Sequence, residues 1–174
     1  LNDTLEVVAY DIASMDDSIS AADGGTFQSD VTFADGADII TASKGTNNVR
    51  LGENAGASIA SGGNNNTTIG YNAGNAITTG DKNTAVGVGS LQANTTGGNN
   101  TAIGYNAGTA ITTGTVNTFV GNLAGDAVTT SHHNTGVGHQ ALTTNVLGSN
   151  SVAVGSFALN SQNPASATDM YNTA

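Results

Sequence analysis

The sequence predicts an all-β protein built as a repeat β-solenoid, and two features of the 174-residue chain indicate this fold. A β-branched residue or Leu followed by Gly recurs along the chain, and after one slightly longer first interval these pairs keep a constant 17-residue period. The composition, with 24 glycines, no Trp and 37% hydrophobic residues, fits a thin core repeated many times. Regular repeats of this kind are typical of stacked units that cannot bury their apolar face alone. The pairs are Leu51-Gly52, Ile69-Gly70, Val86-Gly87, Ile103-Gly104, Val120-Gly121, Val137-Gly138 and Val154-Gly155.

The N-terminal part of the chain predicts a short coiled-coil helix. Apolar residues from Leu1 to Ala22 are spaced alternately four and three positions apart, which is the heptad pattern of a coiled-coil seam. The alternative is an ordinary amphipathic helix packed on the rest of the chain, although the rest offers little broad apolar surface. We expect the helix over residues 1–23 and a β-rich transition segment over 24–47. The predicted seam consists of Leu5, Val8, Ile12, Met15 and Ile19.

Residues 48–160 are expected to form the solenoid coils, each with two short strands and two bends. In the first predicted strand, Thr84 and Val86 point to one face and Ala85 to the other. The second predicted strand is a run such as residues 110–113, which Gly114 ends. Gly and Asn suit the corners, where positive φ angles occur. Seven stacked coils at roughly 4.8 Å each would give a rod section roughly 34 Å long.

Stacking would place equivalent residues above one another and so predicts two ladders along the axis. The apolar ladder consists of Val86, Ile103, Val120, Val137 and Val154. The polar ladder, at a corner, consists of Asn66, Asn83, Asn100, Asn117 and Asn134. Stacked Asn side chains can hydrogen-bond one another and the backbone along the axis. The alternative is that Asn only suits the turn geometry.

Residues 161–174 are predicted to be an irregular segment that leads into a further repeat. The register is lost between residues 161 and 167, which include Pro164, the only proline of the chain. Asn172-Thr173-Ala174 then has the sequence of another repeat opening. We therefore expect the natural protein to continue as a longer fibre.

The charge distribution excludes two classes of partner. The chain carries 13 acidic residues against 3 Lys and Arg, for a net charge of −10, and most of the acids precede residue 39. Nucleic-acid binding needs clustered cations, and so does docking on anionic membrane surfaces. No apolar run is long enough to cross a bilayer. We expect neither nucleic-acid binding nor membrane insertion.

The repeat openings resemble two groups of proteins. Residues 83–87, 100–104 and 151–155 read NTAVG, NTAIG and SVAVG, and they resemble the head repeats of trimeric autotransporter adhesins, although those repeats are usually shorter. The fuller pattern, with NTTG at 94–97 and AITTG at 110–114, is more similar to tail-fibre proteins of marine bacteriophages. The resemblance covers about residues 25–174.

This resemblance implies a structural fibre protein of a virion, a phage tail-fibre shaft that is part of a host-attachment apparatus. It further implies a homotrimer, other virion tail proteins as partners and, in attachment, a host cell-surface receptor. The alternative is the head domain of a bacterial trimeric adhesin on the outer surface of the cell. A second alternative, based on the surface residues, is a monomeric carbohydrate- or ice-binding solenoid.

The sequence leaves open which face of each coil would meet the axis of a trimer. Residues such as Ala85, Gly87, Ala102 and Gly104 are small enough for close approach, but Arg50 and Phe119 occupy the same repeat position as Ala85. Three Arg50 side chains on a dry axis would need counter-charges.

No enzyme activity, cofactor or metal is predicted. His132 and His133 are adjacent at a predicted corner, where they could hold a metal only by meeting their symmetry copies in a trimer. The glycine-rich stretches 52–56 and 70–74 lack the lysine of a phosphate-binding loop. The repeats also lack the regular Asp of calcium-binding solenoids.

Two sets of surface residues support the carbohydrate- or ice-binding alternative. Tyr71 and Tyr105 share one repeat position, and exposed Tyr can stack on sugars, although drift at a surface position is the simpler explanation. Thr pairs at 78–79, 95–96, 112–113 and 129–130 supply a regular array of the kind that ice binding would require.

Overall fold

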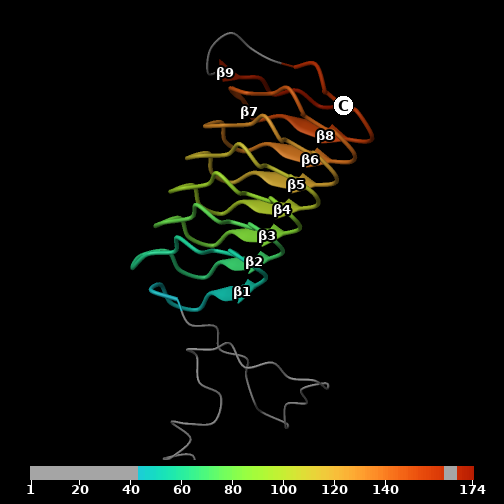
Figure 1. Ribbon diagram of the computed structural model, residues 1–174. Coiled ribbons are helices and arrows are strands. Elements are labelled where there is room, and N and C mark those ends of the chain that lie inside the picture. The colour runs from blue at the N-terminus through green and yellow to red at the C-terminus, as the bar shows by residue number, and fades with distance from the viewer. Residues whose placement is uncertain (1–42, 163–167) are drawn as a thin grey trace, which may run out of the picture. The chain divides into compact units, whose positions relative to one another are not determined.

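In the computed structural model, which describes residues 43–162 and 168–174, the chain is a parallel β-solenoid (Figure 1). The expected repeat fold with 17-residue coils is therefore confirmed for this part of the chain. The predicted helix over 1–23 with its seam, and the transition segment up to residue 42, lie outside the described residues. The loss of register around Pro164 also falls mostly outside them.

One parallel sheet of seven strands runs the length of the solenoid in the order β1-β2-β3-β4-β5-β6-β8. Val49 of β1 pairs with Thr67 of β2. From β2 onward each residue pairs with its equivalent in the next 17-residue repeat, as Thr84 does with Thr101. The strands are β1 (Val49–Leu51), β2 (Thr67–Ile69), β3 (Thr84–Val86), β4 (Thr101–Ile103), β5 (Thr118–Val120), β6 (Thr135–Val137) and β8 (Val152–Val154). Their register reproduces the spacing of the Val/Ile-Gly pairs.

The last described residues continue the stack after an interruption. β7 (Gly148–Ser149) pairs in parallel with β9 (Thr168–Asp169) in a second, two-stranded sheet. Thr173 then forms a parallel bridge with Val152, and the Val152 N–H donates to the Asn172 carbonyl at 2.7 Å. Asn172 and Thr173 thus lie against β8 in the way that each earlier strand lies against its neighbour.

From β1 to β5 each coil contains one three-residue strand, so the second strand predicted at runs such as residues 110–113 is absent there, and the two-residue β7 of a later coil lies just after the predicted position. Residues 110–113 form turns and bends, and isolated bonds, such as the one of 2.9 Å from the Thr112 N–H to the Thr129 carbonyl, link them to the next coil. Asn106 and Gly108 just before this run have φ angles of 51° and 56°. Positive φ angles at alternate positions change the direction of the backbone at each of them and prevent an extended conformation. Too few residues then remain for an extended strand before the corner at Gly114.

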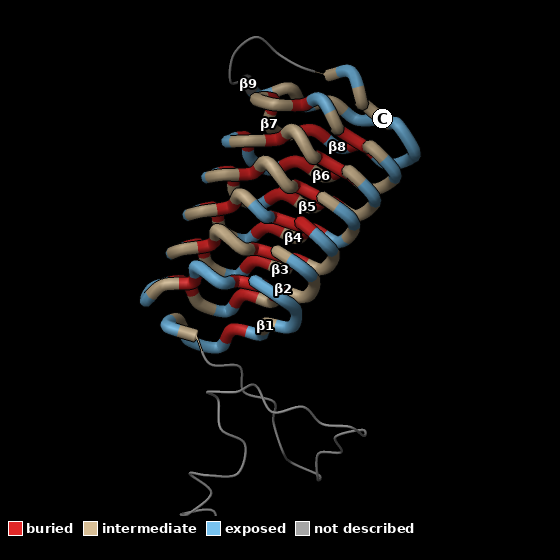
Figure 2. The backbone as a smooth tube through the Cα atoms, viewed as in Figure 1, coloured by how far each residue is buried: buried red, intermediate tan, exposed pale blue. Residues whose placement is uncertain are grey.

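The core is formed by buried residues that recur in every coil, and Figure 2 shows the buried segments of the backbone one above the other along the solenoid. In each strand the middle residue points inward, and Ala85 and Ala102 are fully buried there. A second set of buried alanines at one repeat position belongs to the same core, and larger side chains complete it. These alanines are Ala73, Ala107, Ala124 and Ala141, and the larger residues are Ile77, Ile111, Leu91, Leu142 and Val128. Ala85 and Ala102 therefore pack inside their own coil, and a contact with another chain cannot use them.

Candidate functional site

The five asparagines of the predicted polar ladder lie buried at the strand entrance of successive coils. The Asn83 N–H donates to Asn66 Oδ1 at 2.9 Å, and Asn83 Nδ2 donates to the Gly97 carbonyl at 2.9 Å. The same two bonds recur at Asn100, Asn117 and Asn134. Each amide therefore closes its own coil and binds the neighbouring coil at once.

The asparagine ladder extends beyond these five residues in both directions. The Asn66 N–H donates to Asn48 Oδ1 at 2.8 Å, and the Ser151 N–H donates to Asn134 Oδ1 at 3.1 Å. The ladder asparagines are not the ones with positive φ, which include Asn65 and Asn99 at the preceding position. Buried amides need hydrogen-bond partners, and here the partners lie along the axis. The role of the ladder is to hold the stack together.

Val86, Ile103, Val120, Val137 and Val154 pair with one another in register along the sheet. They lie on the outside of the solenoid, where Ile103 is 40% exposed and Val154 60% exposed. The first residue of each strand, such as Thr84, points to the same side. We call the first and third residues of β1–β6 and β8 the outer sheet face. All of them are Thr, Val, Ile or Leu, so this face is uncharged.

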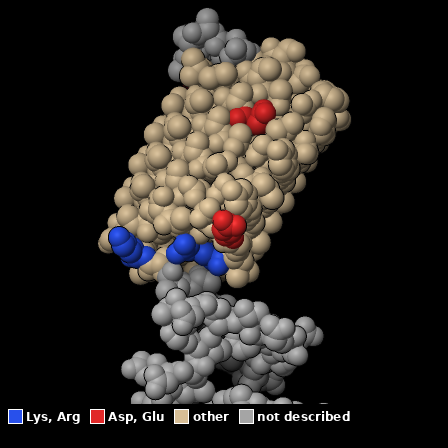
Figure 3. Space-filling model, in the orientation of Figure 1, with Lys and Arg blue, Asp and Glu red and all other residues tan. Residues whose placement is uncertain are grey.

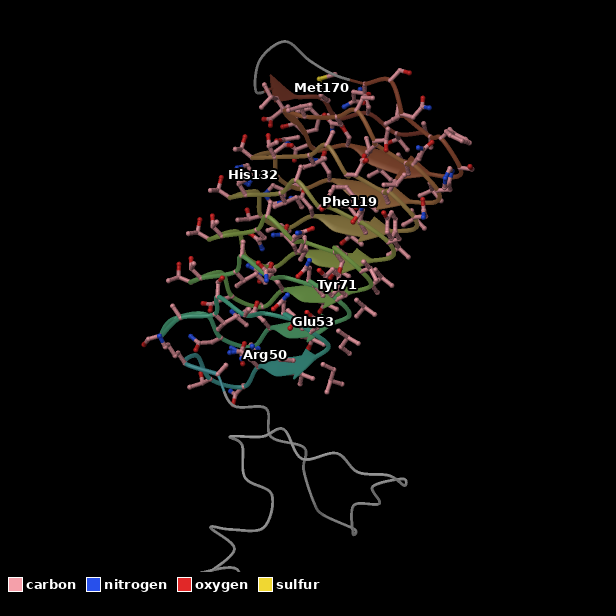
Figure 4. All side chains as sticks on the ribbon, viewed as in Figure 1. Arg50, Glu53, Tyr71, Phe119, His132 and Met170 are labelled. Atoms are coloured by element: carbon pink, nitrogen blue, oxygen red, sulfur yellow. The ribbon has the colours of Figure 1, made fainter. Side chains whose placement is uncertain are left out.

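Arg50 and Phe119, the two large residues at the Ala85 position, both point inward. Phe119 is fully buried. Arg50 Nε donates to the Ala55 carbonyl at 2.8 Å within the first coil. Arg50 and Lys44 also line a pocket of about 470 Å³ at this end of the solenoid, together with Ser58 and Ile59. Figure 4 shows Arg50 at the first strand and Phe119 four strands further along.

His132 and His133 are adjacent and exposed, and Figure 4 shows His132 at the corner that lies away from the strands. The Thr115 N–H donates to His132 Nδ1 at 3.0 Å, and the His132 N–H donates to Ser149 Oγ at 3.0 Å. His139 lies elsewhere, with its ring edge-on to Phe157 at 5.0 Å between ring centres. Within residues 43–162 and 168–174, no three His, Cys, Asp or Glu side chains are grouped so that they could hold a metal ion.

The contact between His132 and Thr115 belongs to a second polar ladder that the sequence did not reveal. In the same column, the Asn64 N–H donates to Asp81 Oδ1 at 2.6 Å and the Thr46 N–H to Asn64 Oδ1 at 2.9 Å. Gly98 interrupts this ladder between Asp81 and Thr115, and the accepting residues Asn64, Asp81, His132 and Ser149 share only a side-chain atom that can accept a hydrogen bond. A search for acceptors at the coil period could have found this ladder, whereas a search for identical residues could not.

The Thr pairs form two columns, one whose hydroxyls hydrogen-bond to the next coil and one that is exposed. The hydroxyls of the first members donate to the carbonyl of the next coil, as Thr78 does to Thr95 at 3.0 Å and Thr95 to Thr112 at 3.1 Å. The second members, Thr79, Thr96, Thr113 and Thr130, are exposed. The surface therefore presents one threonine column from these pairs.

Tyr71 and Tyr105 lie just beyond the corner glycine at the end of their strands. They are 49% and 52% exposed, and Val88 between them is 45% exposed. This column runs beside the outer sheet face. Figure 4 shows Tyr71 near the end of its strand, on the opposite side of the coil from the His132 corner.

Charged side chains are few on the solenoid. Three cations, Lys44, Arg50 and Lys82, and four acids, Glu53, Asp81, Asp126 and Asp169, occur in the described part. The cations all lie between residues 44 and 82, in the first two coils and the residues just before them. Figure 3 shows them gathered at the β1 end, while the rest of the visible surface is nearly uncharged.

Comparisons with protein-family models, with curated proteins and with solved structures gave no match. The fold and its surfaces define the chain as a parallel β-solenoid repeat protein. In the described part of the chain, no helix has the length and hydropathy needed to span a bilayer.

Proposed function

We propose that this chain is a structural fibre protein of a virion, a section of a tail-fibre shaft that belongs to the host-attachment apparatus. The observation that supports the proposal is a set of hydrogen-bond columns that run parallel to the axis without interruption from β1 to β8. The resemblance of the repeats to phage tail fibres supplies the virion assignment, since the fold alone is shared by proteins of several functions.

A solenoid of this construction is suited to a mechanical role. The strands, the asparagine ladder and backbone hydrogen bonds such as the one from Thr112 to Thr129 all connect one coil to the next. A pull along the axis is therefore shared among several hydrogen bonds at every step. Between β1 and β8 the residues that connect the strands form turns and bends whose backbone bonds to the next coil, and exposed loop tips are where proteases usually cut. Stiffness and resistance to proteolysis are what a fibre outside the cell requires.

We further propose that the fibre is a homotrimer whose chains meet through the outer sheet face. This face exposes apolar side chains at Leu51, Ile103 and Val154 and spans about 34 Å by about 10 Å. Identical chains have identical coil spacing, so the Val and Ile rows of neighbouring copies can interleave along the whole length. With three cations against four acids in each described solenoid, charge repulsion opposes association of these sections only weakly.

In this proposal the partners are two further copies of the chain, other tail proteins of the virion and a host cell-surface receptor. The alternative, the head of a bacterial trimeric adhesin, would use the same outer sheet face for self-association. The two differ in where the protein is found. The monomeric carbohydrate- or ice-binding alternative does not require association, and the Tyr71 column is the observation that favours its carbohydrate form.

The virion assignment is tested by immunogold electron microscopy with antibodies raised against the full chain. The proposal predicts gold particles along the tail fibres of purified phage particles that carry the gene for this chain. Labelling of bacterial surfaces, with phage tails unlabelled, would show that the adhesin alternative is correct.

A further inference from the structure

Aromatic rings recur on every second coil of the solenoid, at the surface column that follows the corner glycines. Tyr71, Tyr105 and His139 occupy this column at a constant interval of twice the coil repeat. All three are exposed. The intervening coils carry Val88 and Asn122. At the sheet spacing, two coils correspond to about 9.6 Å along the axis.

Each of these rings is followed directly by a side-chain amide. Asn72, Asn106 and Gln140 are partly exposed and have left-handed φ angles of 56°, 51° and 54°. The intervening coils carry Gly89 and Leu123 at this position. A Cβ on Gly89 would overlap Asn106 Oδ1, so the missing side chain in one coil makes room for the amide of the next. The surface thus repeats a ring and an amide together, two coils apart.

The backbone holds this column rigidly. The Tyr71 carbonyl accepts the Gly89 N–H at 3.0 Å, and the Tyr105 carbonyl accepts the Leu123 N–H at 2.9 Å. The His139 carbonyl accepts the Phe157 N–H at 2.8 Å, and the Phe157 ring packs edge-to-face on the His139 ring. A platform that is already fixed loses little entropy when a ligand binds.

We propose that Tyr71, Tyr105 and His139, with Asn72, Asn106 and Gln140, form a binding strip for a neutral, extended β-1,4-linked glycan. A pyranose ring has an apolar C–H face, which stacks on aromatic rings, and hydroxyl edges, which hydrogen-bond to amides. In a β-1,4-linked chain successive sugars are flipped, so the same face recurs at every second sugar. A platform with a ring on every second coil fits that alternation.

The strip from Tyr71 to Gln140 is uncharged, and the one charged residue of its column is the acid Glu53 in the coil before Tyr71, so the surface suits a neutral sugar better than an anionic one. Residues 71–72, 88–89, 105–106, 122–123 and 139–140 include no Asp, Glu, Lys or Arg. An anionic polysaccharide would find no cation in the strip, because Lys44, Arg50 and Lys82, the cations of the described residues, occupy other positions of the coil. The strip is separated from the outer sheet face by the corner glycines, so glycan binding does not depend on self-association and stands independently of the fibre proposal.

The test is isothermal titration of the full chain with cellohexaose, using maltohexaose as an α-linked ligand of the same size and composition. The inference predicts binding of cellohexaose and at least about tenfold weaker binding of maltohexaose. Replacing either ring, as in Tyr71→Ala or Tyr105→Ala, should weaken cellohexaose binding about tenfold. Both side chains are half exposed, so the variants are expected to fold, which the circular dichroism spectrum and thermal unfolding check.

The matched control is Tyr171→Ala, which removes a tyrosine that is 74% exposed and lies outside the strip; its affinity should equal that of the unaltered chain. The inference is overturned if cellohexaose does not bind, if both hexasaccharides bind equally, or if Tyr71→Ala and Tyr105→Ala leave the affinity of folded protein unchanged. It is also overturned if Tyr171→Ala weakens binding as much as they do.

Discussion

The ring of Phe119 fills the space that a side chain at Gly136 would occupy. The two residues pair across β5 and β6 and share one inward-pointing column. A Cβ on Gly136 would lie 3.0 Å from Phe119 Cδ1, and a Cβ on Gly125 would lie 2.5 Å from the same atom. The large residue in one coil is therefore matched by the smallest residue in the next, while the preceding coils fill the same column with Ala85 and Ala102.

This match predicts strong coupling between positions 119 and 136. Phe119→Ala should lower the free energy of unfolding by about 3–5 kcal/mol because it leaves a cavity, and Gly136→Ala alone by about 1–3 kcal/mol because it overpacks the ring. The double variant restores the alanine column, so its loss should be smaller than the sum of the two. Urea unfolding of the four proteins measures this, and strict additivity would show that the two residues do not compensate one another.

The same principle links the ninth and twelfth residues of each coil, counted from its ladder asparagine, so that Gly108 and Ile111 are the ninth and twelfth residues of the coil that starts at Asn100. Where the ninth residue is Gly, the twelfth is a β-branched residue that fills the space, as Ile111 does above Gly108. Where the ninth is Leu, the twelfth is polar, as in Leu91 with Asn94. Asn94 Nδ2 donates to the Gly97 carbonyl at 3.1 Å, but its Oδ1 is the buried side-chain atom that lacks a partner in the described part of the chain.

We therefore predict that Leu91→Gly combined with Asn94→Ile is more stable than either single variant. Leu91→Gly should cost about 2–5 kcal/mol through the cavity it opens, and Asn94→Ile alone should overpack Leu91. Together they reproduce the Gly-Ile arrangement and remove the unpartnered oxygen. Thermal unfolding by circular dichroism provides the comparison. A double variant that unfolds at or below the temperature of the more stable single variant would contradict the interchangeability of the two arrangements.

Val116 has a left-handed backbone that suits other residues better. Its φ is 58°, whereas Asn99 and Asn150 hold the equivalent position in other coils with φ of 58° and 59°. A β-branched residue is strained in this region, and Asn tolerates it. Val116→Asn should therefore raise the free energy of unfolding by about 1 kcal/mol. Thr113→Asn, at an exposed position without a positive φ, is the control and should change little; equal effects at both sites would refute the strain argument.

The asparagine ladder gives the largest predicted effect of a polar substitution. Asn100→Ala removes the acceptor of the Asn117 N–H and the donor to the Gly114 carbonyl, and both residues are buried. Each unsatisfied buried group costs about 1–3 kcal/mol, so a loss of about 2–6 kcal/mol is expected in urea unfolding. Asn122→Ala, at an exposed position, should cost less than about 0.5 kcal/mol. If Asn100→Ala were as stable as this control, the hydrogen bonds of the Asn100 side chain would make no net contribution to the free energy of unfolding.

The repeat period and the ladder positions could be predicted from the sequence because stacking forces equivalent residues into register. Which face of each strand points into the coil could not be predicted, because Thr84 and Val86 look more suited to a core than Ala85 does. Ala85 points inward and Val86 outward, but the inward column also holds the β-branched Thr68 and the large Phe119, so residue type alone does not mark the inward face. The ladder through His132 was missed since its members share an acceptor atom and no residue type. The compensating pair Phe119 and Gly136 becomes visible only when the coils are aligned in space.

Self-association through the outer sheet face is the central claim, and sedimentation equilibrium of the full chain tests it most directly. One chain has a mass of 17.1 kDa, and the trimer has three times this mass. We predict the trimer mass for the unaltered chain and for Thr113→Asp, which places a charge on an exposed bend. Ile103→Asp, which places a charge in the centre of the face, should sediment as a folded single chain or dissociate at least a hundredfold more readily. The mass of a single chain for the unaltered protein at all concentrations would contradict the claim, as would a trimer that Ile103→Asp leaves intact.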